Sequence, residues 1–175
     1  MKRVLACLLL LSVLVGCRAS YEKTSSAESG DAARIPANAS VYVGMSPDGR
    51  YGETVYFGSG SITTQTLVTA LAAALDKVGH SETILDRETG LAQTRAGSFD
   101  YYLEPKILHW EDRNTVWSAR PDAISVEVTL LDAATGAEID TTTIKGTSKI
   151  FAFSDSRPRD LLLAPMRDYA AELVR

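Results

Sequence analysis

The chain has 175 residues, the length of one domain of ordinary size, and 45% of them are hydrophobic. Its formal net charge is −4 at pH 7. Affinity for nucleic acid comes largely from Lys and Arg side chains that contact phosphates, so this acidic balance argues against DNA or RNA as a partner. It also argues against broad contact with anionic lipid.

The N-terminus has the three parts of a secretory signal. A Lys-Arg pair follows Met1, an apolar run extends over residues 4–15, and Gly16 precedes Cys17. The run has about a dozen residues, whereas a membrane-spanning helix needs about 20. We therefore expect residues 1–16 to be a signal peptide that is removed. Its loss takes away two positive charges and changes the net charge from −4 to −6.

The signal ends in Leu14-Val15-Gly16-Cys17, which resembles the lipobox of bacterial lipoproteins. In such proteins the Cys17 thiol would carry a diacylglyceryl group, with a further acyl chain such as palmitate on the new amino group. Two or three buried chains hold a protein stably, at about 0.8 kcal/mol per CH₂. Arg18 stands where enteric bacteria use Asp as the inner-membrane retention signal. We therefore expect the outer membrane of a Gram-negative cell, on its periplasmic side.

The cysteine count limits the chemistry of the mature chain. Cys7 lies in the signal, and Cys17 is consumed by the lipid. The rest has no thiol for a disulfide, a metal or a nucleophile. Residues 17–38 are rich in Ser, Ala, Glu and Lys, so we expect the lipidated cysteine and a flexible tether there. Residues 39–175 are expected to form a single globular domain.

From Ala39 onwards the pattern predicts alternating strands and helices. Residues 41–43 are a short β-rich run, and residues 51–57 form either a loop or a second short strand. An apolar stripe predicts a helix over residues 62–78, with Ser61 as its cap and Gly79 just past its end.

The middle of the chain predicts a strand, a helix and a long strand. Residues 81–85 are strand-like, and residues 89–96 form a short helix closed by Gly97. The long strand covers residues 99–110. Alternation puts Phe99, Tyr101, Leu103 and Ile107 on one face and Tyr102, Leu108 and Trp110 on the other. Pro105 lacks an N–H, which indicates a strand edge or a bulge.

The last part predicts a hairpin and a helix. Residues 123–131 alternate well, residues 137–153 are rich in Thr and Ile, and the short turn between them requires antiparallel pairing. A final helix begins near Pro158, and Pro165 should kink or restart it. The expected order is β-α-β-α-β-β-β-α. This predicts a mixed α/β fold, with a sheet of parallel and antiparallel strands and helices packed on it.

No catalytic set stands out. His80 and His109 are isolated and lack zinc-ligand spacing, so we expect no metal. Residues 58–61, Gly-Ser-Gly-Ser, are not a nucleophile elbow and lack the Lys of a phosphate loop, so we interpret them as a flexible link into a capped helix. We expect no catalytic residue and no cofactor. An envelope hydrolase that uses His109 with Glu111 or Asp112 stays open as an alternative.

Both tryptophans lie in the stretch 109–122, among charged residues. Trp and Arg are the residue types that most often anchor protein contacts. The candidate partner-binding residues are Trp110, Glu111, Asp112, Arg113, Trp117, Ser118, Arg120 and Asp122. The alternative is a packed loop, in which Trp110 ends a buried strand face, Trp117 packs back, and the two arginines pair with Asp112 and Asp122.

These stretches resemble the DUF4823 lipoproteins of proteobacteria, over nearly all of residues 40–175. The matching segments are Val41–Val43, Asp48–Tyr56, Gly58–Gly60, Phe99–Tyr102, Pro105–Arg113, Trp117-Ser118, Arg120–Asp122 and Pro158–Leu162. The family implies no known activity. At fold level the element order is similar to the N-terminal domain of the translocation protein TolB and to small outer-membrane lipoproteins that activate peptidoglycan synthases, which are binding modules of the envelope.

The sequence therefore favours a non-catalytic adaptor. An outer-membrane lipoprotein would present a binding module to an envelope protein, with its lipid anchor as the contact to the membrane. The envelope hydrolase and a purely structural or self-assembling lipoprotein remain as alternatives.

Overall fold

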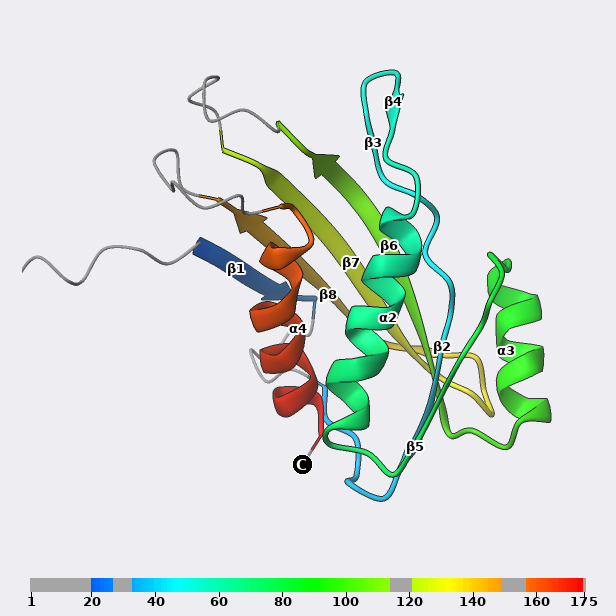
Figure 1. Cartoon of the computed structure of the whole chain (residues 1–175). Coiled ribbons are helices and arrows are strands. Elements are labelled where there is room, and N and C mark those ends of the chain that lie inside the picture. The colour runs from blue at the N-terminus through cyan, green and yellow to red at the C-terminus, as the bar shows by residue number, and fades with distance from the viewer. Residues whose placement is uncertain (1–19, 27–32, 114–120, 149–156, 175) are drawn as a thin grey trace, which may run out of the picture.

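The structure, a computed structural model, describes residues 20–26, 33–113, 121–148 and 157–174. Its centre is a six-stranded mixed sheet with the strand order β1-β8-β7-β6-β2-β5 (Figure 1). The elements are β1 (Ser20–Ser25), β2 (Ser40–Val43), β3 (Arg50–Tyr51), β4 (Thr54–Val55), α2 (Ser59–Ala72), β5 (Lys77–His80), α3 (Arg87–Ala96), β6 (Tyr101–Glu111), β7 (Ala123–Asp132), β8 (Glu138–Thr147) and α4 (Asp160–Leu173).

The sheet combines two kinds of pairing, which confirms the predicted mixed α/β class. β6, β7 and β8 form an antiparallel meander, and β1 adds to β8 in the antiparallel sense. β2 lies parallel to both β5 and β6. Parallel neighbours need a crossover, and α2 and α3 supply the two crossovers. The short β3 and β4 form a separate antiparallel hairpin that projects from the domain (Figure 1).

The two sheet faces are covered differently. α2 and α4 pack against each other and against one face, which carries the main core (Figure 1). Alternate residues of β7, from Ile124 to Leu130, point into this core, as the sequence predicts. On the opposite face Leu91 of α3 packs on Tyr102 and Leu131 in a smaller cluster.

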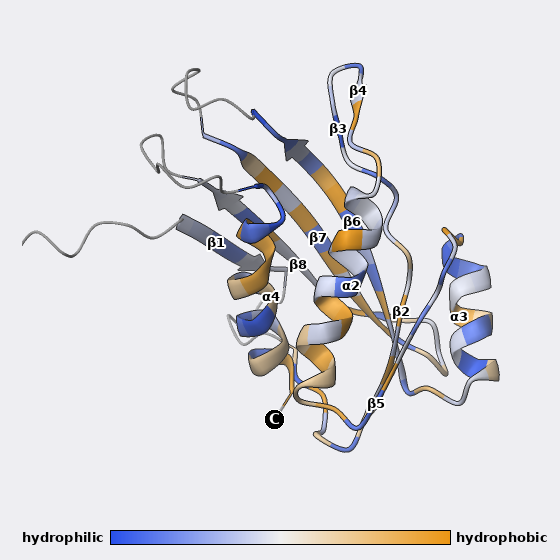
Figure 2. Cartoon of the chain, viewed as in Figure 1, coloured by the Kyte–Doolittle hydropathy of each residue, from blue (hydrophilic) through white to orange (hydrophobic). Residues whose placement is uncertain are grey.

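The final helix is built as its apolar periodicity predicts. The buried stripe of α4 consists of Leu161, Leu162, Met166, Tyr169, Ala170 and Leu173. Figure 2 shows hydrophobic residues along both α2 and α4. Pro165 is also buried, and α4 continues through it as one helix, so the predicted restart does not occur. Pro165 lies in the second turn of α4 and has no N–H. The helix therefore lacks one backbone hydrogen bond, the one to the Leu161 carbonyl oxygen.

The predicted end of the first helix is wrong. α2 stops at Ala72, and residues 77–80 form β5 instead of the helix end and its cap. Val78 pairs with Val41 of β2. The next residue, Gly79, is partly buried in the sheet between the side chains of Tyr42 and Phe99. No strand covers residues 81–85. Sheet pairing, which is not visible in local periodicity, overrides helical spacing here.

The expected tether also differs in part. Residues 20–25 form β1, which pairs with β8 over six residues. Tyr21 donates a hydrogen bond to Asp168, and Lys23 forms an ion pair with Glu172, so α4 holds this strand too. Ile35 is 2% exposed and its N–H bonds to Leu173 O at 2.7 Å. A polar strand is stable at this edge because β8 offers it a full ladder of backbone partners.

Within the described residues, no helix has the length and apolar content needed to cross a membrane.

Candidate functional site

The candidate surface lies where β6 ends and β7 begins, beside the β3–β4 hairpin. A clamp between the chain before the hairpin and the start of α2 positions it. Asp48 Oδ1 accepts a hydrogen bond from the Gly60 N–H at 2.9 Å, and Ser59 Oγ accepts one from the Gly49 N–H at 2.8 Å. A carboxylate at a helix N-terminus satisfies a free N–H and suits the helix dipole.

This clamp explains the Gly-Ser-Gly-Ser segment without any phosphate or nucleophile chemistry. Gly58 has φ 85°, and α2 begins at Ser59, so Asp48 takes the capping role that the sequence assigns to Ser61. A Cβ on Gly60 would lie 2.1 Å from Ser46 O. The segment is therefore a close backbone crossing and not a flexible link.

Trp110 lies in the core, which changes its predicted role. The register of β6 shifts between Ile107 and His109, and this bulge turns Trp110 to the same side as Leu103. Trp110 is 4% exposed. Trp110 therefore ends a buried strand face, as the packed-loop alternative expects, because a bulge reverses the alternation beyond it and buries the ring.

Glu111 is held by two basic neighbours on the other face of β6. Its carboxylate forms an ion pair with Arg113 and lies 3.4 Å from His109 Nε2. The ring of Tyr51 meets that of His109 edge to face, with centroids 5.3 Å apart. The hydrogen bond to Glu111 raises the pKa of Arg113 further above its usual range. Glu111 is 6% exposed, so it braces the strand end and offers no free carboxylate.

Asp122 closes the other side of the loop. Its Oδ1 accepts the Arg113 N–H at 2.8 Å, and its own N–H donates to Ser148 Oγ at 2.8 Å. Burial raises the pKa of Asp122, partly opposed by the Arg113 N–H. Arg113 and Asp122 therefore join β6 to β7. This contact uses the backbone N–H of Arg113, while its guanidinium group pairs with Glu111, so it is not the arginine–aspartate ion pair of the packed-loop alternative. Trp117, Ser118 and Arg120 lie outside the described residues.

The structure brings the residues of the hydrolase alternative together only in part. Asp112 lines an open hollow of about 380 Å³ together with Phe57, Trp110 and Arg159, and neither His109 nor Glu111 reaches it. Asp112 directly follows the end of β6 and lies with Trp110 in this hollow, whereas Glu111 lies with His109. His109 and Glu111 do lie together, 3.4 Å apart, but Glu111 is 6% exposed and ion-paired with Arg113. The form of the alternative that pairs His109 with Asp112 finds no support in this geometry.

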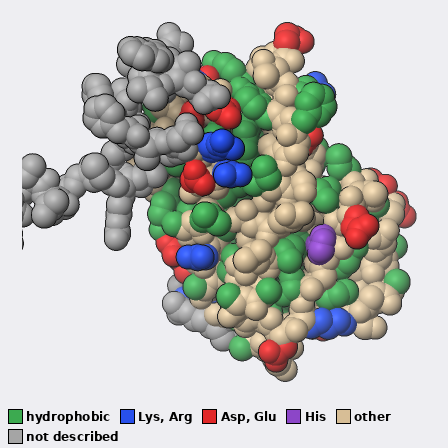
Figure 3. All heavy atoms as spheres, in the orientation of Figure 1, with side chains coloured by type: hydrophobic (Ala, Val, Ile, Leu, Met, Phe, Trp, Pro, Cys, Tyr) green, Lys and Arg blue, Asp and Glu red, His purple; other side chains and the backbone are tan. Residues whose placement is uncertain are grey.

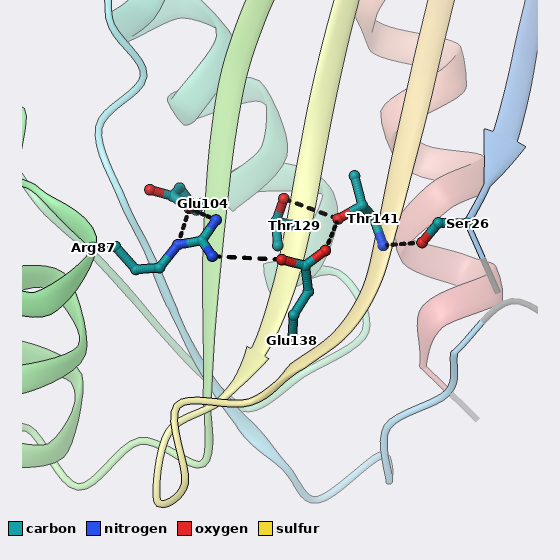
Figure 4. A network of polar contacts seen from close by, with 6 residues as sticks. All are labelled: Ser26, Arg87, Glu104, Thr129, Glu138 and Thr141. Atoms are coloured by element: carbon teal, nitrogen blue, oxygen red, sulfur yellow. Dashed lines mark hydrogen bonds and ion pairs between the residues drawn. The ribbon is translucent and has the colours of Figure 1, made fainter.

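A second polar cluster, missed in the sequence, crosses the open face of the sheet (Figure 4). Arg87 contacts Glu104 at 2.7–2.8 Å and Glu138 at 3.4 Å. The cluster continues through Thr141, whose hydroxyl donates to Glu138 at 2.7 Å and lies 3.1 Å from Thr129 Oγ1. Its members are 17 to 54 residues from Arg87 in the chain, so no local spacing reveals the cluster. It ties α3 to β6 and β8.

Among the residues that the structure describes, no three His, Cys, Asp or Glu side chains gather as a metal site would require.

Solved structures with the same fold include two of PelC from Paraburkholderia phytofirmans, both described as dodecamers. The first has 16% identity and a TM-score of 0.67, covering 90% of this chain and 99% of that one. The second, an L103M variant, has 17% identity and a TM-score of 0.64, covering 90% and 100%. Protein XCC0632 from Xanthomonas campestris has 13% identity and a TM-score of 0.50, covering 81% and 83%.

A search of curated protein sequences finds no match. The profile described as "Domain of unknown function (DUF4823)" matches residues 33–173, which includes α2, α3, α4 and all strands except β1. The match spans most of the chain and confirms the resemblance drawn from the sequence. The chain therefore belongs to the DUF4823 family.

Proposed function

We propose that this chain is a lipoprotein of the cell envelope, attached through Cys17 to the outer membrane and facing the periplasm, where it acts as a non-catalytic binding module. The observation that carries the proposal is the segment Leu14–Cys17 behind a short apolar signal. The shared fold with PelC is compatible with it. The division into a signal, a lipidated cysteine and a folded domain belongs to the same proposal.

Metabolic labelling with a palmitate analogue tests the anchor. The wild type should carry the label and sediment with the outer-membrane fraction. The Cys17→Ser variant should lose the label and leave that fraction, because no acyl chains hold it. Equal labelling of the two proteins contradicts the proposal. Cys7→Ser is the matched control, since Cys7 lies in the segment expected to be removed.

The partner is proposed to be an envelope protein that contacts the 109–122 loop. The loop combines Trp117 and Arg120 with a rigid stem, because Arg113 and Asp122 fix its two ends. Crosslinking of the lipidated protein in envelope membranes, followed by mass spectrometry, identifies the partner. Trp117→Ala and Arg120→Ala should each reduce its recovery about tenfold, as hot-spot losses do. Unchanged recovery for both variants refutes the loop assignment.

Self-assembly is the second candidate, favoured by one observation: the PelC structures with this fold are dodecamers. In the described part of the chain, β5 is an edge strand that could pair with a copy. Light scattering on the detergent-solubilised protein decides between the two candidates. A discrete oligomer of this chain alone supports self-assembly, and a monomer supports the adaptor.

A further inference from the structure

The chain enters the fold at a defined end of the sheet. Ser20 pairs with Thr147, Thr147 with Ala123, and Ala123 with Glu111, so these four residues form one row across β1, β8, β7 and β6. Cys17 is three residues before Ser20. Three residues reach at most about 10 Å. If Cys17 is lipidated, as proposed above, this row lies close to the surface of the membrane.

Exposed apolar side chains concentrate at the same end. Seven large hydrophobic or aromatic side chains are exposed in the described residues. Five lie in the half of the molecule where β1 begins, on β1, β3, the chain before α2, the outer part of β6 and the first turn of α4: Tyr21, Tyr51, Phe57, Leu108 and Leu163. Of these, Tyr51 lies in the β3–β4 hairpin and Phe57 closely follows it, and they are the apolar side chains of the surface proposed below.

Phe57 is the most exposed of them, at 88%. It follows the projecting β3–β4 hairpin, and Figure 3 shows hydrophobic side chains beside that hairpin. The hollow next to Phe57 is also lined by Arg157 and Arg159, which directly precede α4, and by Asp112. Arg159 lies 3.8 Å from the Asp160 carboxylate. An aromatic ring with arginines around it is the composition that favours a membrane interface, where the ring enters the headgroup region and the guanidinium groups stay at the phosphates.

We infer that this end, consisting of Tyr51, Phe57, Arg157 and Arg159, is a membrane-docking face that rests on the leaflet holding the acyl chains of Cys17. The inference deepens the proposed function and depends on it. The short reach from Cys17 to Ser20 keeps the face at the surface. The opposite end, where β6 begins and β7 turns into β8, then points into the periplasm, and the 109–122 loop faces a partner at the membrane surface.

The inference fits the overall charge. The net charge of −6 after signal removal opposes broad contact with anionic lipid. A small face that combines one aromatic ring with two arginines avoids this repulsion, because the acyl chains supply the affinity and the face only sets the orientation.

The test uses the full mature lipoprotein in vesicles of phosphatidylethanolamine and phosphatidylglycerol that contain a brominated lipid as quencher. Phe57→Trp places a reporter in the face. Ile84→Trp is the matched control, because Ile84 is 61% exposed and lies between β5 and α3, beside Pro105 and Lys106 in the middle of β6 and away from the row of Ser20 and Glu111. The quenching of the parent protein, which has two tryptophans, is the baseline.

We expect the added fluorescence of Phe57→Trp to be quenched at least about twofold more than that of Ile84→Trp, with its emission shifted to the blue. Equal quenching of the two variants overturns the inference. A blue shift of Phe57→Trp that depends on protein concentration and not on lipid also overturns it, because the ring is then covered by a second copy. Mass spectrometry of the same sample reports the diacylglyceryl group, so a missing lipid is recognised as a failure of the proposed function and not of the docking face.

Discussion

At the residue scale, close backbone contacts decide what single positions tolerate. The crossing of Gly60 over Ser46 leaves no room for a side chain, and the clamp through Asp48 depends on that crossing. The Gly-Ser-Gly-Ser segment, which the sequence alone suggests is a flexible link, is therefore one of the most constrained sites in the domain.

Gly60→Ala should lower the free energy of unfolding by about 1–3 kcal/mol or prevent folding, because its Cβ meets Ser46 O at 2.1 Å. Urea unfolding followed by circular dichroism measures the change. Ser61→Ala is the control and should stay within about 0.5 kcal/mol, since the Ser61 hydroxyl accepts a hydrogen bond of 3.3 Å from the exposed Gln65 amide. A Gly60→Ala protein as stable as the control contradicts the crossing.

Asp100 should make the domain sensitive to acid. Its carboxylate accepts hydrogen bonds from the Ser40 hydroxyl at 2.7 Å and the Ser40 N–H at 2.8 Å, which lower the pKa of Asp100. A lowered pKa stabilises the fold above the ordinary value of about 4, and this stability is lost as the pH falls through the folded-state pKa.

Urea unfolding from about pH 6 to about pH 3 tests this. Asp100→Asn should lose stability at neutral pH and show a smaller further loss on acidification than the wild type. Ser40→Ala should fall between the two, because it keeps the backbone donor. An unchanged pH slope in Asp100→Asn would show that Asp100 makes no such contribution.

At the element scale, α4 binds the main core through one side only. Leu162 is fully buried and its neighbour Leu163 is 50% exposed. The helix also holds β1 through Tyr21 and Asp168, and it meets Ile35 near its end. Loss of its packing should therefore loosen the N-terminal segments as well as the core.

Leu162→Ala should lower the free energy of unfolding by about 2–5 kcal/mol, because it removes a buried side chain and leaves a cavity. Leu163→Ala has the same chemical change at a half-exposed position and should cost less than about 1 kcal/mol. Denaturant unfolding of both variants measures the difference. Similar losses for the two would mean that α4 is rotated relative to the structure.

At the scale of the whole molecule, the N-terminal segment is part of the fold. The family profile begins at residue 33, yet β1 completes the sheet edge beside β8. Without β1 the backbone groups of β8 would be unpaired at an open edge, which invites association between molecules.

A chain that begins at residue 39 should therefore be less stable and more prone to self-association than one that begins at residue 20. The shorter chain lacks the β1 ladder and the buried Ile35. Thermal unfolding and light scattering compare the two. Equal melting temperatures and equal molar masses would mean that residues 20–38 do not stabilise the domain, as expected of the tether that the sequence predicts over residues 17–38.

The sequence by itself determined the features that depend on local periodicity and local chemistry. The alternation in β7 and the stripe of α4 give the faces that these elements bury, since side-chain direction follows from secondary structure alone. The sequence also determined the mixed α/β class and the family. The proposed lipid attachment at Cys17 comes from the same source, the local pattern of a signal and its exit.

Only the tertiary structure decided what depends on partners far away in the chain. Val78 became a strand residue because Val41 lies beside it. Trp110 turned into the core because a bulge reversed its face. The polar segment of β1 joined the sheet because β8 had a free edge. In each case the energy comes from pairing across long sequence separations, which local patterns do not record.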